Sequence, residues 1–314
     1  MRVLIIGGAG FVGLSITEAL LARGDAVTLF DARAPYAALP GGPSVVTGDV
    51  RRDDDVARAF AANPDTTIYG AAITADATRD AAEPQRVLDV NLGGLPRAMA
   101  AARAVGVKRF ILLSSASAFG DAAFRDAPLA EDDPAPAPSS LYSITKFAGE
   151  GVARRLGALW SMDVRMVRLS AVFGPWEHAT GARDTLSPPF QVAQLAHAGK
   201  AVVLPRDPPR DWVYSRDVAN AVLALIDKTS PRFDLYHIGP GTSWKLSEWA
   251  ATLGATVRVG TPPNVDLFGD RDRAMLAIGR LVDDLGYRPR FTSAESCAED
   301  YLRWFNRESG GTSS

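Results

Sequence analysis

The chain has 314 residues, of which 47% are hydrophobic, enough for a sizeable core. Lysine and arginine number 34 against 36 for aspartate and glutamate, which argues against a broad basic surface for nucleic acid or an anionic membrane. The single cysteine, Cys297, excludes an intramolecular disulfide framework and a multi-cysteine metal site, and it favours a reducing compartment. We see no charged leader and no apolar stretch of roughly 20 residues, so we expect a cytoplasmic protein.

The first elements predict a dinucleotide-binding unit. Residues 2–6 form an apolar run typical of a buried parallel strand, and residues 11–23 have helical spacing. Between them, Gly7, Gly10 and Gly13 form a GxxGxxG pattern. Glycine at these positions lets the backbone approach a pyrophosphate at the N-terminus of the helix.

The second strand, 27–30, ends at Asp31, which lies 18 residues beyond Gly13. A carboxylate at this point accepts hydrogen bonds from the adenine-ribose hydroxyls of NAD and repels the 2′-phosphate of NADP. We therefore predict NAD as the cofactor, while Arg33 nearby leaves the strictness of that preference open.

Strands and helices then alternate along the chain. We expect strands at 44–46, 67–70, 110–114 and 164–169, and helices at 54–61, 87–105 and 141–160. This rhythm predicts an α/β fold with a Rossmann-type doubly wound parallel sheet. We assign 1–173 to an NAD-binding Rossmann domain and 174–314 mainly to a smaller substrate-binding lobe, with returns to the first domain near 210–240.

The remaining segments carry simpler signals. Residues 131–140 are acidic and rich in proline, so we expect an extended segment with solvated carboxylates. Its last residue, Ser140, is a good N-cap for the helix that follows. Aromatic residues at 244–249 and 301–305 have helical spacing, and we expect them in the core of the second lobe.

The strongest chemical signal is the pair Tyr142 and Lys146. Four residues apart on a helix, the phenol and the ammonium share one face, so the positive charge lowers the pKa of the tyrosine and makes it a base. Ser114 and Ser115 precede the pair at the end of an apolar run. After a dinucleotide-binding start, this order predicts hydride transfer to or from a nicotinamide.

Several motifs together resemble the NAD-dependent epimerase/dehydratase family, part of the extended short-chain dehydrogenase/reductase group. The matching segments are similar to the family's PDVVIHLAA, NxxG, SSxxVYG, RxxNxYGP and RDFVYVxDV motifs, and they lie at 64–72, 91–94, 114–120, 168–175 and 210–218. The resemblance implies that Ser115 holds the substrate hydroxyl. It also implies that Tyr142 takes the proton of this hydroxyl and that Lys146 binds the nicotinamide ribose and tunes the tyrosine.

The same resemblance implies a wider set of contacts. The cofactor is expected at Gly7, Gly10, Phe11, Val12, Gly13, Asp31, Asp49, Val50, Ala71, Ala72, Asn91, Tyr142, Lys146, Ser170 and Val172. The substrate is expected at Thr74, Ser115, Ser117, Tyr142, His178 and Arg210. The three histidines lack the paired spacing of a zinc site, so no metal is predicted.

Departures from the family narrow the chemistry. Family dehydratases place Asp and Glu after the catalytic threonine, where this chain has Ala116 and Ser117. Family decarboxylases need a glutamate at the position of Ser117, and a Cys and His pair for double epimerisation is absent at any plausible spacing. Two outcomes remain, which are release of a ketone, as in a dehydrogenase, or return of the hydride to the other face, as in a 4-epimerase.

The substrate loops favour the dehydrogenase in our sequence interpretation. Ala171 replaces the asparagine that contacts the diphosphate in nucleotide-sugar members, and 205–209 replaces the family's Gly-Asp-Gly turn. We therefore expect a sugar or sugar acid held by Arg210, with a UDP-sugar 4-epimerase as the alternative. A non-catalytic NAD-sensing protein is a second alternative, although such proteins usually lose the tyrosine or lysine.

The quaternary structure is predicted from two helices. Residues 90–105 and 142–160 are rich in alanine and glycine. Their counterparts in the resembled family commonly build a four-helix dimer interface, so we predict a homodimer that binds a small carbohydrate.

Overall fold

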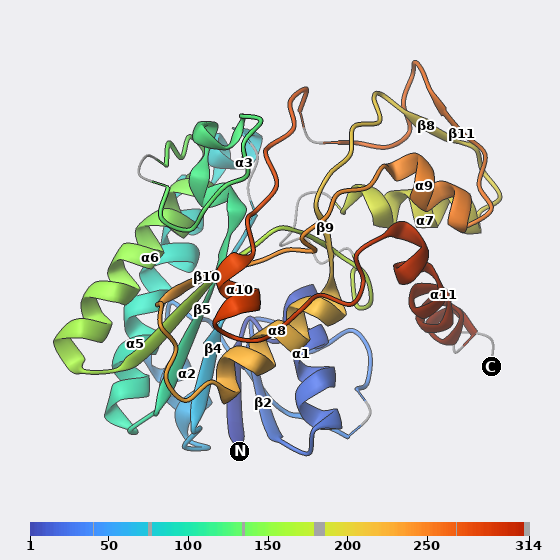
Figure 1. The fold of residues 1–314 in the computed structure, drawn as a ribbon. Coiled ribbons are helices and arrows are strands. Elements are labelled where there is room, and N and C mark those ends of the chain that lie inside the picture. Colours follow the sequence, from blue (N-terminus) through green and yellow to red (C-terminus); the bar gives the residue numbers. More distant parts are fainter. Residues whose placement is uncertain (40, 75–76, 134–135, 179–185, 268, 311–314) are drawn as a thin grey trace.

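The central element of the fold is a parallel sheet with strand order β3-β2-β1-β4-β5-β6-β10 (Figure 1). The computed structural model describes residues 1–39, 41–74, 77–133, 136–178, 186–267 and 269–310. The strands are β1 (Arg2–Ile6), β2 (Ala26–Asp31), β3 (Ser44–Thr47), β4 (Thr66–Tyr69), β5 (Arg109–Ser115), β6 (Asp163–Leu169) and β10 (Leu235–Ile238). The strand order reverses at β1, which confirms the predicted doubly wound Rossmann-type sheet.

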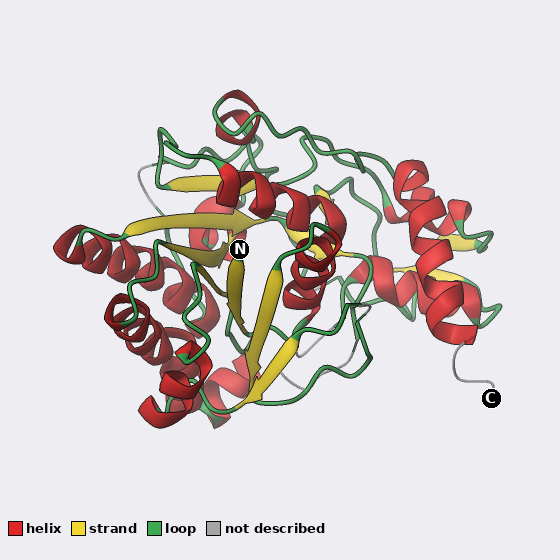
Figure 2. Cartoon of the chain, turned by 90° about the horizontal axis from the view of Figure 1, so that it is seen from below, coloured by secondary structure: helices red, strands yellow, loops and turns green. Residues whose placement is uncertain are grey.

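Helices cover both faces of this sheet (Figure 2). One face packs against α1 (Phe11–Ala22), α8 (Ser215–Asp227) and α10 (Gly279–Asp283). The other packs against α2 (Asp53–Phe60), α5 (Gly94–Ala104) and α6 (Leu141–Trp160). Within the ranges given above, we find no helix long and apolar enough to cross a bilayer.

The helix expected at 87–105 is built from three pieces. It starts earlier, as α4 (Pro84–Leu88), because proline is well suited to a first helical turn. It then widens into a π-helical turn at Asp89–Gly93 before continuing as α5. A π turn inside a helix often marks a functional position, and this one carries Asn91.

The segment before α6 corrects one prediction and confirms another. Ser140 caps α6, since its Oγ accepts the Ser143 N–H at 3.2 Å and the Ser143 Oγ accepts the Ser140 N–H at 2.9 Å. The expectation of solvated carboxylates is wrong for Glu131, which is buried and accepts the His237 N–H at 3.0 Å. Asp132 does extend into solvent, with 78% of its side chain exposed.

A second apolar core lies beyond the sheet (Figure 1). Its elements are β7 (Ala171–Phe173), α7 (Pro188–His197), β8 (Val202–Leu204), β9 (Trp212–Tyr214), α9 (Leu246–Thr252), β11 (Val257–Val259) and α11 (Ala294–Gly310). The aromatic residues predicted for this core do pack there, with Trp249 and Tyr301 both fully buried. Meanwhile α8 and β10 return to the Rossmann sheet, while the boundary at residue 173 stays a prediction.

Short elements complete the chain. Helix α3 (Ala77–Ala82) precedes α4, and two 3₁₀ turns, η2 (Ala116–Phe119) and η3 (Asp121–Ala123), follow β5. The turn η2 packs against α6, so the end of β5 and the start of α6 lie together. This places the predicted serine and tyrosine in one region of the molecule.

Candidate active site

The predicted site residues gather at one edge of the sheet. Parallel strands bring their carboxyl ends to the same edge. Five predicted residues end or follow neighbouring strands there, and they are Gly7, Asp31, Ala71, Ser115 and Ser170. These residues from distant motifs thus lie in a row along one edge of the sheet.

The glycine turn between β1 and α1 leaves no room for side chains. Gly7 has φ +80°, and a Cβ there would lie 2.7 Å from the Ala71 backbone nitrogen. A Cβ on Gly13 would lie 2.6 Å from the Gly7 carbonyl oxygen. Gly10 stands at the N-cap of α1 and has no side chain that would compete with a phosphate. This cradle fits the pyrophosphate of a dinucleotide, with Phe11 and Val12 opening the helix.

Asp31 is fixed beside that turn. Its Oδ2 accepts the Ala9 N–H at 3.1 Å, and its Oδ1 accepts the Arg33 N–H at 3.4 Å. Burial raises the pKa of this carboxyl, and the two N–H groups oppose the shift. The carboxylate therefore lies where an adenine ribose next to the glycine turn would meet it.

Asn91 braces the loop after β4. Its Oδ1 accepts the Ile73 N–H at 2.7 Å, and its Nδ2 donates to the Ile73 carbonyl at 2.9 Å and to Thr145 Oγ1 at 3.3 Å. The amide thereby joins the loop that carries Ala71, Ala72 and Thr74 to α6. Its predicted contact with the cofactor stays a prediction.

Asp49 and Val50 follow β3. Asp49 forms a salt bridge with Arg51. Val50 is buried and packs closely on Gly94, since a Cβ on Gly94 would lie 2.8 Å from the Val50 side chain. Their expected roles at the cofactor stay predictions.

The structure brings Ser115, Tyr142 and Lys146 into one region. Lys146 Nζ donates to the Leu113 carbonyl at 2.9 Å, two residues before Ser115 on β5. The same Nζ lies 5.6 Å from the centre of the Tyr142 ring. Ser115 Oγ accepts the Ser117 N–H at 3.1 Å, which orients the serine at the start of η2. A hydroxyl, a phenol and an ammonium thus lie in one region, and their roles toward nicotinamide and substrate stay predictions.

Lys146 has a shifted acid–base equilibrium. Burial lowers its pKa to about 8, and the negative charge of Glu150 opposes that shift. Glu150 lies one turn further along α6, where Arg168 and Ser114 bind its carboxylate. The lysine therefore stays largely protonated at neutral pH and titrates just above it.

Three further predicted residues, Ser170, Val172 and His178, have contacts of their own. Ser170 Oγ accepts from Arg273 at 2.8 Å and donates to the Asp211 carbonyl, and Val172 packs against the core under α1. The His178 ring contacts the Tyr36 ring in a tilted arrangement, with ring centres 3.6 Å apart, and its Nδ1 lies 3.1 Å from the Trp176 carbonyl oxygen. His178 thus lies beside the connection between β2 and β3, and its role toward substrate stays a prediction.

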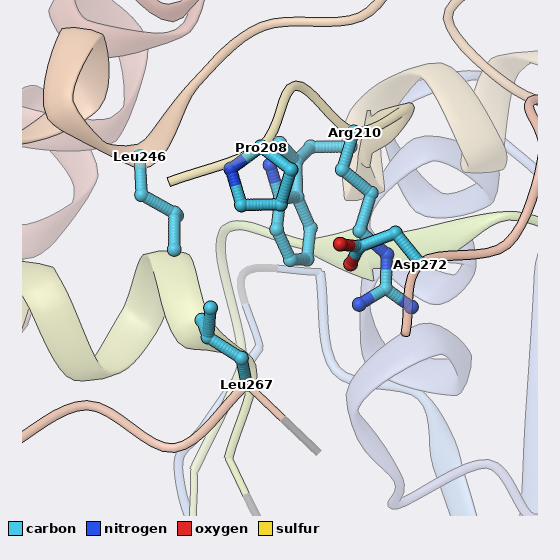
Figure 3. Close-up of a pocket in the computed structure, with 6 residues that line it drawn as sticks. Pro208, Arg210, Leu246, Leu267 and Asp272 are labelled. Atoms are coloured by element: carbon cyan, nitrogen blue, oxygen red, sulfur yellow. The ribbon is translucent and has the colours of Figure 1, made fainter. Parts of the chain in front are cut away.

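Arg210 lines a pocket together with Pro208, Trp212, Leu246, Leu267 and Asp272 (Figure 3). Its guanidinium carbon lies 4.8 Å from the centre of the Trp212 ring. Burial, and then the charge of Arg273, lowers the pKa of Arg210 to about 10. Its Nε is buried without a hydrogen-bond partner among the described residues. The expected role of Arg210 toward substrate stays a prediction.

Sequence reasoning missed the charged residues around these groups. Glu150 had a signal, because it continues the spacing of Tyr142 and Lys146 by one more helical turn. Arg168 was seen within a motif, but its partner on α6 was not. Asp211 was seen within the motif at 210–218, but its partner Arg273, which pairs with it at 3.0 Å, comes from a distant segment and gave no signal.

Comparisons with known proteins agree with this geometry. Residues 3–239 match the model of the NAD dependent epimerase/dehydratase family. The chain is 26% identical to the dTDP-L-rhamnose 4-epimerase of Burkholderia thailandensis, covering 98% of this chain and 95% of that one. It is 28% identical to a probable UDP-glucuronate 4-epimerase of Rhizobium meliloti, covering 98% and 97%.

Solved structures of epimerases are also similar to this chain. The UDP-glucose 4-epimerase of Thermus thermophilus, solved with NAD, superposes with a TM-score of 0.77 at 30% identity and covers 96% of this chain and 99% of that one. An epimerase from Methanothermobacter thermautotrophicus superposes with a TM-score of 0.84 at 25% identity, covering 99% and 94%. This protein belongs to the NAD dependent epimerase/dehydratase family, and it is an extended short-chain dehydrogenase/reductase enzyme with NAD as its cofactor.

Proposed function

We propose that this enzyme is a nucleotide-sugar 4-epimerase. The observation that carries the proposal is one base, Tyr142 at the start of α6, which lies beside Lys146 and in one region with Ser115 at the end of β5, while Ala116 and Ser117 supply no second acid for elimination. One base that takes a proton and gives it back is what epimerisation through a ketone requires. The curated relatives named above are 4-epimerases of nucleotide sugars, which supports the same reaction.

In this mechanism the side chains handle the proton and hold the sugar. NAD, when bound in the glycine cradle, supplies the nicotinamide that takes up and returns a hydride. Ser115 holds the C4 hydroxyl toward Tyr142, and the Tyr142 phenolate accepts its proton. Lys146 keeps a positive charge beside that phenolate. After the ketone turns over in the pocket, Tyr142 donates the proton back, so the chain needs no external acid or base.

This proposal reverses the order that the sequence suggested. Ala171 and the segment 205–209 favoured a dehydrogenase acting on a smaller sugar. Losing the asparagine costs a nucleotide sugar one neutral hydrogen bond, a net of about 0.5–1.5 kcal/mol, which does not exclude it. The relatives favour the epimerase over the dehydrogenase. The NAD-sensing alternative is not supported, because the chain belongs to an enzyme family and keeps both Tyr142 and Lys146.

Arg210 is the group that we assign to the diphosphate. Its buried Nε has no partner among the described residues, and Arg206 and Arg273 add positive charge nearby. Asp211 and Asp272 offset this charge and pair with Arg273 and Arg206, respectively, which leaves Arg210 as the cation without a salt-bridge partner among the described residues. A diphosphate can accept two bonds from one guanidinium, which a neutral free sugar does not match.

The test is turnover of a panel of substrates. Purified enzyme is incubated with NAD and with UDP-glucose, UDP-glucuronate, dTDP-rhamnose, free sugars and sugar acids. Proton NMR follows inversion at C4, and absorbance follows NADH. We expect inversion of a nucleotide sugar without net NADH. Ketone with stoichiometric NADH would support the dehydrogenase instead, and Arg210→Ala should lose nucleotide-sugar binding.

We also propose a homodimer formed through α5 and α6. Ile144, Phe147 and Leu159 are exposed apolar side chains on α6, and Leu159 is 56% exposed. Phe147→Glu should convert a dimer to a monomer in sedimentation velocity at micromolar concentration. Leu302→Glu, at an exposed leucine of α11, is the control. A wild-type monomer would refute the proposal.

A further inference from the structure

A buried ion pair lies beneath the catalytic lysine. Arg168 on β6 donates from Nε to Glu150 Oε1 at 2.9 Å and from Nη2 to Oε2 at 2.7 Å. Ser114 on β5 donates to the same carboxylate at 2.6 Å. Glu150 is only 2% exposed. Three elements that form the floor of the active site therefore meet at one carboxylate.

This carboxylate lies on the lysine's own helical face. Tyr142, Lys146 and Glu150 follow one another at four-residue intervals along α6. Among its causes, the charge of Glu150 works against the effect of burial on the Lys146 pKa. Without a negative charge nearby, a desolvated ammonium loses its proton more easily.

Among the residues that the structure describes, few other charges lie near Glu150 and Lys146. Arg154, on the same helix, pairs with Asp234 at 2.5 Å and senses Glu150 only at long range. Behind Arg168, His237 from β10 is held neutral, because burial and then the Arg168 charge lower its pKa to about 3. The Phe119 ring of η2 covers Arg168, with its centre 4.4 Å from the guanidinium carbon. The local balance is therefore set by Lys146, Glu150 and Arg168.

We propose that Glu150 and Arg168 are positioning residues for the reaction, acting through Lys146 to keep an ammonium beside the Tyr142 phenol. This inference rests on the proposed function for its effect on turnover. Arg168 holds the carboxylate in place with two parallel bonds, and Ser114 ties it to the strand that carries Ser115. Glu150 then supplies the negative charge that a buried lysine needs.

If the ion pair served only stability, its removal should change the activity in a different way. Replacing a buried pair by apolar groups is often neutral for stability, whereas removing one partner leaves an unpaired charge. A purely structural role would lower activity equally at all pH values. An electrostatic role moves the titration of Lys146, and that difference makes the inference testable.

The experiment measures the titration midpoint of Lys146 directly. Lysine labelled with ¹³C and ¹⁵N is followed by NMR in the NAD-bound enzyme, and the Lys146 signal is assigned with Lys146→Arg. In Glu150→Gln, we expect the midpoint to fall by on the order of one pH unit, because an opposite charge has been removed. The alkaline limb of kcat should move to lower pH by the same amount.

Two further variants complete the test. The double variant Glu150→Gln with Arg168→Met removes one charge of each sign and should restore the midpoint toward wild type. Glu299→Gln removes a carboxylate that is 85% exposed and pairs with Arg303 on α11, so it should leave the midpoint unchanged. If Glu150→Gln does not fold, Arg168→Met alone decides. Its midpoint should rise, because a positive charge near Lys146 has been removed.

A Lys146 midpoint that stays unchanged in folded Glu150→Gln, or in Arg168→Met, would overturn the inference. The titration requires no sugar. Failure to turn over any nucleotide sugar would therefore count against the proposed function alone, and the NMR midpoint would still decide the role of Glu150.

Discussion

The Rossmann part and the second core of this enzyme are held in different ways. The cofactor edge depends on backbone geometry, since a side chain at Gly7 or Gly13 would collide with main-chain atoms. The second core depends on aromatic packing, with Phe173, Trp244 and Tyr301 all in ring contact with Trp249. Binding chemistry and packing stability are thus concentrated in separate regions, and substitutions in the two regions should have separable effects.

The largest effect should be a loss of turnover in a variant that still folds. Tyr142→Phe removes the proton acceptor, so kcat should fall by about 10²- to 10⁴-fold. NAD affinity by calorimetry and the melting temperature should stay near wild type, which serves as the control. Turnover within a few-fold of wild type would show that Tyr142 is not the base.

A substitution in the second core should instead lower the stability of the fold. Trp249 is fully buried, and its Nε1 donates to the Pro189 carbonyl at 2.9 Å. Trp249→Ala should lower the free energy of unfolding by about 3–5 kcal/mol, measured in urea. Val259→Ala, at an exposed position of β11, should change it little. Equal losses in both variants would contradict the assignment of Trp249 to the core.

A smaller effect is expected at the adenine end. Asp31→Ala should weaken NAD binding by about 1.5–3 kcal/mol, because hydrogen bonds from the ribose to a charged group are lost. The preference for NAD over NADP should narrow as well. Calorimetry with both cofactors measures this, with the exposed Asp53→Ala as control. Tighter binding of NADP by the unmodified enzyme would count against our assignment of Asp31.

These regions also differ in how far the sequence revealed them. The glycine turn, Asp31 and the Tyr142 helix are local patterns, so spacing alone predicted their elements and the cap at Ser140. The pairing of Glu150 with Arg168 joins a helix to a strand 18 residues later, and nothing in local spacing specifies which arginine a buried glutamate will meet. Glu131 was misjudged for the same reason, since its partners His237 and Arg280 come from distant segments.

The smallest effect tests that local prediction. Ser140→Ala removes the N-cap of α6 and should cost about 1 kcal/mol of unfolding free energy. The neighbouring Ser139→Ala, at an exposed serine, is the control. If the two variants unfold at the same urea concentration, the capping box contributes nothing measurable.

The bonds of Asn91 carry a consequence for chemical ageing of the enzyme. Thr145 Oγ1 donates to the Tyr142 carbonyl at 2.9 Å, so it receives the Asn91 Nδ2–H as an acceptor. Deamidation to aspartate would replace that donor by an oxygen without changing the size of the side chain. The contact to the Ile73 carbonyl would then become a repulsion between acceptors, and Thr145 could keep its contact only by turning its hydroxyl away from the Tyr142 carbonyl. A single exchange of nitrogen for oxygen would thereby loosen both the loop after β4 and the backbone that carries Tyr142.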